Sequence, residues 1–137
     1  MRTGYRTTRV LAAGYLLVVL FAVLWPSGGD VTAVKAGLGP WFLTPAGKDI
    51  ALNLAMLAPL TFLACLGWPR VPWWTWVLAG CALSLGAELM QWVLPALDRR
   101  PSLFNVVQNG VGAWLGVALA GLLSRRRRRS GAGTRRV

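Results

Sequence analysis

An acid and a carboxamide stand three residues apart inside a long apolar stretch of the chain. Glu88 and Gln91 belong to the run WWTWVLAGCALSLGAELMQWVLPAL, in which no other side chain is charged. Residues three or four apart on a helix share one face, so these two side chains can act together. A carboxylate accepts hydrogen bonds or serves as a general base, whereas a carboxamide both donates and accepts.

Other polar residues could join them. Asn53 interrupts a second apolar run, and Asn105 and Asn109 stand four apart at the start of another. Arg99 and Arg100 follow Glu88 in the segment PALDRRPSL, and guanidinium groups bind phosphate well. The sequence therefore predicts a ligand-binding cluster of Asn53, Glu88, Gln91, Arg99, Arg100, Asn105 and Asn109.

The composition restricts what chemistry this cluster can perform. The chain has no histidine, which excludes histidine-dependent triads and histidine-ligated zinc sites. Its two cysteines, Cys65 and Cys81, lie in apolar runs and are interpreted as small packing residues. We therefore predict no metal and no cofactor.

The elements that position these residues follow from hydrophobicity. Of 137 residues, 55% are hydrophobic and 14% charged, and the apolar residues form blocks of about 20, the length of a membrane-spanning helix. No block alternates with period two, as strands of a membrane barrel would. We expect an all-α integral membrane four-helix bundle of two transmembrane hairpins, with spans at about Val10–Trp25, Ile50–Trp68, Trp73–Leu94 and Phe104–Leu123.

The basic residues predict the topology. One side of a four-span chain receives a set of arginines and no acid, namely Arg2, Arg6, Arg9, Arg70, Arg125 to Arg129, Arg135 and Arg136. By the positive-inside rule this side is the cytoplasm, so both termini are cytoplasmic. Lys35, Lys48, Arg99 and Arg100 fall on the outer side with Asp30, Asp49 and Asp98.

The two ends of the chain are expected to flank the membrane domain. Residues 1–9 form a cytoplasmic N-terminus, residues 10–123 the four-span domain, and residues 124–137 a basic disordered cytoplasmic tail. Arginines directly after a span usually contact anionic lipids, which is the predicted partner of Arg125, Arg126, Arg127, Arg128 and Arg129. No folded nucleic-acid reader accompanies them, so we predict no nucleic acid.

Helical spacing predicts how the spans pack. Gly80, Ser84, Glu88 and Gln91 share one face of the third span, and Asn105, Asn109, Gly112 and Gly116 share one face of the fourth. We expect these two stripes to face each other, with glycines allowing close approach and polar groups bonding across the seam. Ser84 and Gln108 are interpreted as interhelical hydrogen bonds only. Whether the chain forms a homo-oligomer stays open.

The ordered set of residues resembles the VanZ-like family of small bacterial membrane proteins. The resemblance covers about residues 49 to 123 and is carried by Asn53 with Pro59, Glu88-x-x-Gln91, the segment RRPSL, and N-x-x-x-N-x-x-G-x-x-x-G from Asn105 to Gly116. It implies a multi-pass protein of the bacterial cytoplasmic membrane. The family usually has aspartate where this chain has Asn105, and it is named for a protein associated with teicoplanin resistance.

Several functions are compatible with this sequence. The favoured one is binding of a lipid or envelope-precursor head group by the outer-leaflet cluster, with an effect on glycopeptide (teicoplanin-type) susceptibility. The main alternative is a structural or partner-binding membrane subunit whose polar residues are interhelical hydrogen bonds. An intramembrane enzyme with Glu88 as general base, and a transporter or channel, are less favoured.

Overall fold

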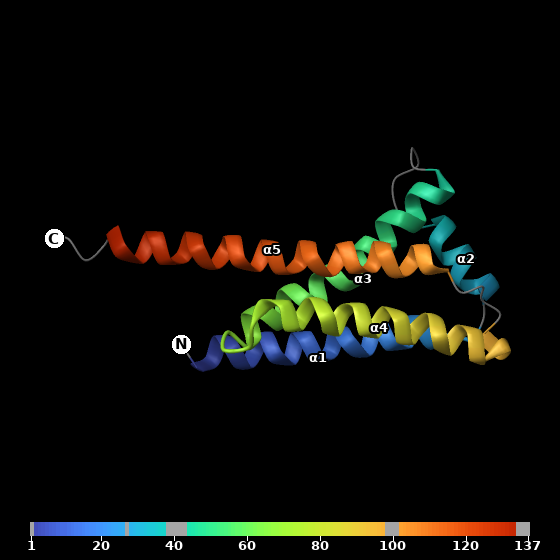
Figure 1. Ribbon diagram of the computed structural model, residues 1–137, viewed down its shortest axis with the longest axis horizontal. Helices are drawn as coiled ribbons and strands as arrows, with labels where there is room; N and C mark the ends of the chain where they lie inside the picture. The colour runs from blue at the N-terminus through green and yellow to red at the C-terminus, as the bar shows by residue number, and fades with distance from the viewer. Residues whose placement is uncertain (1, 27, 38–43, 98–101, 134–137) are drawn as a thin grey trace.

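The chain is built from helices. The computed structural model describes residues 2–26, 28–37, 44–97 and 102–133, and these contain no β-strand. In chain order the elements are α1 (Arg2–Leu24), α2 (Gly28–Gly37), α3 (Pro45–Gly67), α4 (Trp73–Val93), the 3₁₀ helix η1 (Pro95–Leu97) and α5 (Leu103–Gly133) (Figure 1). The expected all-α architecture is confirmed.

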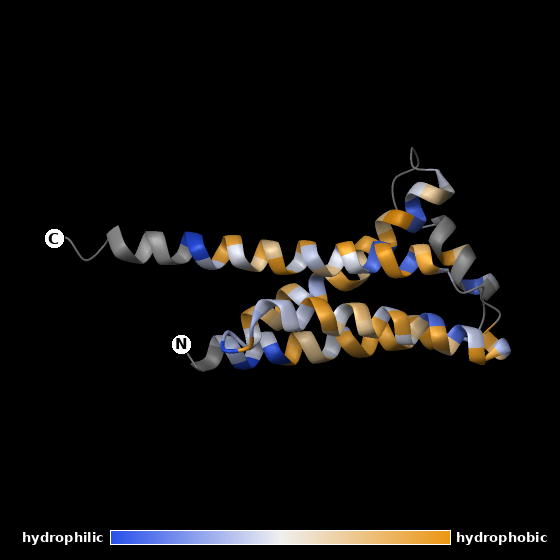
Figure 2. Ribbon diagram, viewed as in Figure 1, coloured by the Kyte–Doolittle hydropathy of each residue, from blue (hydrophilic) through white to orange (hydrophobic). Residues whose placement is uncertain are grey.

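Four of the helices are long and apolar enough to cross a membrane, as predicted. The qualifying segments are Gly4–Leu24, Ala46–Gly67, Trp73–Val93 and Leu103–Arg126. Figure 2 shows apolar residues along the middle of these helices and hydrophilic residues toward the two ends of the bundle. The chain is therefore a multi-pass membrane protein.

Two features differ from the sequence-based expectation. The stretch predicted to be a disordered tail from residue 124 is instead helical as far as Gly133, because arginine favours helix and a helix already formed extends without a new nucleus. A short helix, α2, was not predicted at all. Its sequence GGDVTAVKAG has glycine at both ends and too few apolar positions to show a period.

Local sequence sets where the spanning helices start and stop. At α3, the Thr44 side chain accepts a hydrogen bond from the Gly47 N–H at 3.1 Å, and Pro45 occupies the first helical turn. Helix α4 begins directly after Pro72 and ends just before Leu94 and Pro95, because the residue that precedes a proline disfavours helical conformation.

Helix α3 lies at the centre of the bundle. It packs most extensively on α5 and next on α1, while α4 packs mainly on α5 and barely touches α1. The α1–α3 and α3–α5 seams meet around Leu57, which is fully buried together with Val19 and Ala113. In Figure 1, α1 begins and α5 ends at the same end of the bundle, and α2 lies at the other.

The close approach of α5 is to α3, which corrects the glycine half of the predicted pairing of stripes. The polar half is confirmed, because Asn105 and Asn109 donate to Glu88 and Ser84 of α4. A Cβ atom on Gly112 would come 2.2 Å from the Leu54 carbonyl oxygen, and one on Gly116 would come 2.1 Å from that of Ala58. On α4 the close approach is at Gly80. A Cβ there would lie 2.9 Å from that of Ala113 on α5 and 3.5 Å from Thr61 Cγ2 on α3, so Gly80 lies where the three helices meet.

Candidate functional site

The predicted polar residues of α3, α4 and α5 meet at the end of the bundle away from the start of α1 and the end of α5. Glu88 is 8% exposed and lies one turn beyond Ser84 on the buried face of α4. We call the group formed by Asn53, Ser84, Glu88, Ser102, Asn105, Gln108 and Asn109 the Glu88 cluster.

Both oxygens of the Glu88 carboxylate accept hydrogen bonds from the start of α5. The Ser102 backbone N–H donates to Oε2 at 2.5 Å, and the Asn105 side-chain amide donates to Oε1 at 3.0 Å. Ser102 immediately precedes α5, so its N–H belongs to the first turn that a helix leaves without an internal partner. A negative charge at this position is also favoured by the helix dipole.

The network continues from Asn105 to α3. The Asn53 side-chain amide donates to Asn105 Oδ1 at 3.0 Å and to Gln108 Oε1 at 2.7 Å. Asn105 thus accepts from α3 on one side and donates to α4 on the other. Because a carboxylate only accepts, Glu88 determines the orientation of each amide along this chain.

A second contact between α4 and α5 lies one turn deeper. The Asn109 side-chain amide donates to Ser84 Oγ at 2.9 Å, and both residues are buried. Asn109 Oδ1 is buried as well, and among the described residues it has no hydrogen-bond partner. A buried carboxamide oxygen without a donor is unusual and costs stability.

Not all predicted site residues join this network. Asn53, Glu88 and Asn105 are directly connected, and Asn109 lies beside them through Ser84. Gln91 is half-buried, and within the described part of the chain no hydrogen bond connects it to the others. Arg99 and Arg100 lie outside the described residues.

Three members of the cluster, Ser84, Ser102 and Gln108, were not predicted as site residues. Ser84 and Gln108 were assigned to interhelical hydrogen bonds only, although the spacing of three between Asn105 and Gln108 places both on one face of the helix. Ser102 contributes a backbone group, and the signal for it was serine directly before the apolar run of α5, a typical helix N-cap position.

The geometry limits the chemistry of the cluster. One carboxylate is surrounded by amide donors, and among the described residues no three histidine, cysteine, aspartate or glutamate side chains gather as metal ligands. The cluster can accept and donate hydrogen bonds in a buried setting and carries one ionisable group. That set suits recognition of a polar group better than nucleophilic chemistry, for which a second acid–base residue would be needed.

Comparison with known proteins identifies the family. A family model described as VanZ/LLP1 matches residues 12–124, which is most of the chain and covers the greater part of all four spanning helices. No curated protein and no solved structure matches the chain. The matched region contains the whole Glu88 cluster, and the extent of the match shows that the chain belongs to the VanZ/LLP1 family.

Proposed function

We propose that the Glu88 cluster binds the polar head group of a membrane lipid or of a lipid-linked envelope precursor. The observation that carries this proposal is Glu88, an acid that is 8% exposed between membrane-spanning helices. Charged groups at such positions are costly and usually have a function. Arg99 and Arg100 precede Ser102 by three and two residues in the sequence and would supply cations for a phosphate.

Some polar groups in and beside the cluster make no hydrogen bond to the described residues of the cluster. Asn109 Oδ1 has no donor among the described residues, and Gln91 takes no part in the network. A head group with hydroxyl or amine donors would satisfy the Asn109 oxygen, provided that the amides rearrange to admit it. The proposal therefore predicts that the cluster changes its internal hydrogen bonds when it is occupied.

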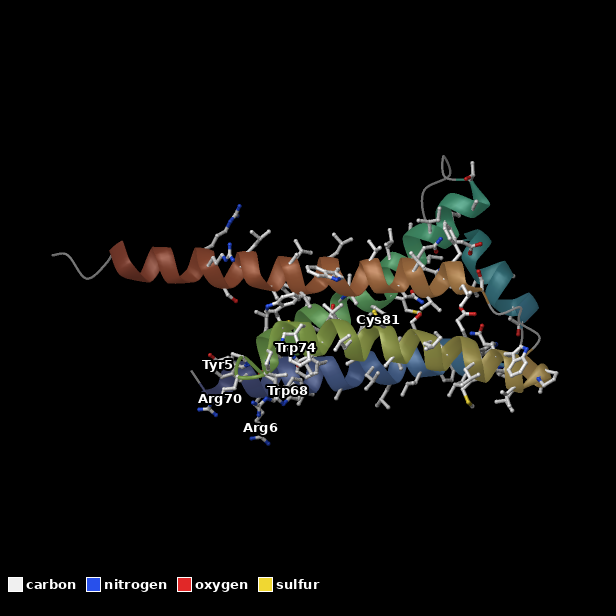
Figure 3. The ribbon with its side chains drawn as sticks, viewed as in Figure 1. Tyr5, Arg6, Trp68, Arg70, Trp74 and Cys81 are labelled. Atoms are coloured by element: carbon white, nitrogen blue, oxygen red, sulfur yellow. The ribbon has the colours of Figure 1, made fainter. Side chains whose placement is uncertain are left out.

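We further propose that the cluster faces the outside of the cytoplasmic membrane. The acids Asp30, Asp49 and Glu88 belong to its end of the bundle, whereas Arg6 and Arg70 lie at the opposite end (Figure 3). The positive-inside rule assigns the arginine-rich end to the cytoplasm. The cluster would then lie in the outer leaflet, where envelope precursors and glycopeptides meet.

One observation favours a different function. Each hydrogen bond described for the cluster joins two of the helices α3, α4 and α5, or α4 to the residue before α5, which is what interhelical hydrogen bonds in a purely structural membrane subunit would do. In this alternative the polar residues fix the packing of the bundle. Direct binding distinguishes the two functions.

Binding is tested with the purified full chain in detergent by native mass spectrometry, using a polyprenyl diphosphate and phosphatidylethanolamine as probes. We expect wild type to retain at least one of the probes, and Glu88→Gln to lose it. Asp30→Asn is the matched control, since it removes one carboxylate from exposed α2, and it should bind as wild type does. The proposal would be contradicted if Glu88→Gln retained both probes as well as wild type does, or if wild type retained neither probe.

Survival in teicoplanin tests the cellular consequence. Cells that express wild type at a level matched to the variants should survive better than cells without it. Glu88→Gln and the double variant Arg99→Ala plus Arg100→Ala should lose that protection. Unchanged protection by both variants would assign the cluster to packing, and absence of protection by wild type would refute a role in glycopeptide susceptibility.

A further inference from the structure

The opposite end of the bundle carries a basic hollow. Its volume is about 840 Å³, and the residues lining it include Tyr5, Arg6, Arg9, Trp68 and Arg70. Figure 3 shows Tyr5, Arg6, Trp68 and Arg70 gathered at the end where α1 begins and α3 connects to α4. Three arginines from two segments far apart in sequence therefore line one space.

The arginines of this hollow have no acid near them in the sequence. Neither α1, nor residues 68–72, nor α5 contains an aspartate or glutamate. The acid of α4 is Glu88, which is 15 residues after Trp73 and hence about 22 Å along the helix at 1.5 Å per residue. No nearby carboxylate of these segments therefore balances the positive charge of the arginines that line the hollow.

Arg9 is held in place at the boundary of the hollow. Its Nε donates to the Gly67 carbonyl oxygen at 2.8 Å, and its guanidinium carbon lies 5.2 Å from the centroid of a Trp68 ring. The hydrogen bond uses Nε and leaves the two terminal nitrogens for another acceptor. A guanidinium fixed in this way loses little conformational freedom when it binds an anion.

An apolar cavity adjoins the hollow through the shared residue Trp68. It has a volume of about 360 Å³ and lies between α1, α3 and α4, where α1 and α4 barely touch. Its lining is almost wholly apolar and includes Ala13, Leu16, Leu60 and Leu83. Its one hydroxyl, that of Thr61, already donates to backbone carbonyl groups, among them that of Ala113 at 2.9 Å.

The linings of the two spaces follow one another along one face of α1. Arg6, Arg9, Ala13 and Leu16 are spaced by three, four and three residues, so the basic and apolar linings form one stripe. Trp76 also lines the cavity, and among the described residues its buried indole N–H has no acceptor. Since Trp76 is in the first turn of α4, this N–H lies close to the basic end.

We propose that this composite site binds one anionic phospholipid, with its phosphate on Arg6, Arg9 and Arg70 and one acyl chain in the cavity. The site runs from arginines to an apolar cavity, and a phospholipid runs in the same order from its phosphate through its ester carbonyls to its hydrocarbon chains. An ester carbonyl would satisfy the buried Trp76 N–H once neighbouring side chains move aside. Both volumes fall within the range of about 300–1,000 Å³ that is usual for small-ligand sites.

The test is a native mass spectrometric titration of the full chain with phosphatidylglycerol and phosphatidylcholine that carry the same acyl chains. Wild type should bind phosphatidylglycerol about tenfold more tightly or better. The double variant Arg6→Gln plus Arg70→Gln should lose about 30-fold in affinity for phosphatidylglycerol. Ala13→Phe fills the cavity and should lower the affinity for phosphatidylglycerol about tenfold. That loss corresponds to about two methylene groups of the acyl chain that are no longer buried.

Matched controls separate this site from a general attraction of basic surfaces for anionic lipid. Arg135→Gln plus Arg136→Gln removes the same charge from the segment after α5, and Ala118→Phe enlarges an exposed position of α5. Both should bind as wild type does. Equal binding of the two lipids, equal losses in the two arginine pairs, or no loss in Ala13→Phe would each overturn the proposal. Glu88→Gln should leave this binding unchanged, so the two proposals can fail separately.

Discussion

At the scale of single residues, Glu88 is set apart by the number of hydrogen bonds that it accepts. A glutamine in its place would offer one oxygen to two donors, the Ser102 N–H and the Asn105 amide. Its NH₂ group would then face a donor unless Asn105 turned over. Turning Asn105 over would in turn break the bond from Asn53, because two NH₂ groups would meet. The acid is therefore required by the network even before any ligand is considered.

This argument predicts compensation between positions 88 and 105. Glu88→Gln and Asn105→Asp should each lower the free energy of unfolding by about 1–3 kcal/mol, because each leaves mismatched polar groups. The double variant Glu88→Gln plus Asn105→Asp should recover much of the loss. Its glutamine would donate to the new aspartate, which still accepts from Asn53, and would accept from Ser102.

The measurement is a double-mutant cycle of unfolding in detergent. Gln91→Ala is the control, because Gln91 makes no hydrogen bond to the network within the described residues. Additive losses in the double variant would refute the assigned hydrogen-bond directions.

At the scale of helices, the α3–α5 seam depends on two glycines. A Cβ at Gly112 or Gly116 would lie a little over 2 Å from the carbonyl oxygen of Leu54 or Ala58, respectively. There is therefore no room for a methyl group at either glycine. The contacts are to backbone, which cannot turn aside as a side chain can. Any larger residue must therefore move a whole helix.

We expect Gly112→Ala to lower the free energy of unfolding by about 1–3 kcal/mol, the usual cost of overpacking. Gly121→Ala is the matched control on the same helix, because a Cβ at Gly121 meets nothing within 4 Å. It should cause no loss, since alanine favours helix more than glycine does. Equal effects of the two substitutions in thermal unfolding would contradict this account of the seam.

The spans were predictable because their signal is local, and the polar faces of α4 and α5 were paired correctly, whereas the partner of the glycine face was not predicted. A run of about 20 apolar residues identifies a membrane helix without reference to any other part of the chain. A stripe such as Gly112 and Gly116 says only that some neighbour approaches closely, and here that neighbour is α3 rather than α4. The connection of Asn53 to Asn105 and Gln108 likewise depends on three helices at once.

At the scale of the whole molecule, the distribution of charge predicts the orientation in the membrane. The chain has 15 basic and 4 acidic residues, and no acid lies before Asp30 or between residues 50 and 87. The start of α1, the connection between α3 and α4, and the end of α5 meet at one end of the bundle (Figure 1). This end should be cytoplasmic.

Cysteine labelling checks the orientation. In a background with Cys65 and Cys81 replaced by alanine, a membrane-impermeant maleimide should label Ala33→Cys in intact cells. It should label Arg125→Cys only after the membrane is permeabilised. Both positions are exposed, and they lie at opposite ends of the bundle. Labelling of Arg125→Cys in intact cells would reverse the proposed topology.

Because helix α5 is continuous, a movement at one of its ends also moves the other end. It runs unbroken from Leu103 to Gly133, and Asn105 and Arg126 are 21 residues, about 32 Å, apart along it. If the helix stays straight, a tilt of about 10° at Asn105 displaces Arg126 by about 5 Å. A change in the hydrogen bonds between Glu88 and the start of α5 that tilted the helix would therefore also displace Arg126 at the opposite end of the bundle.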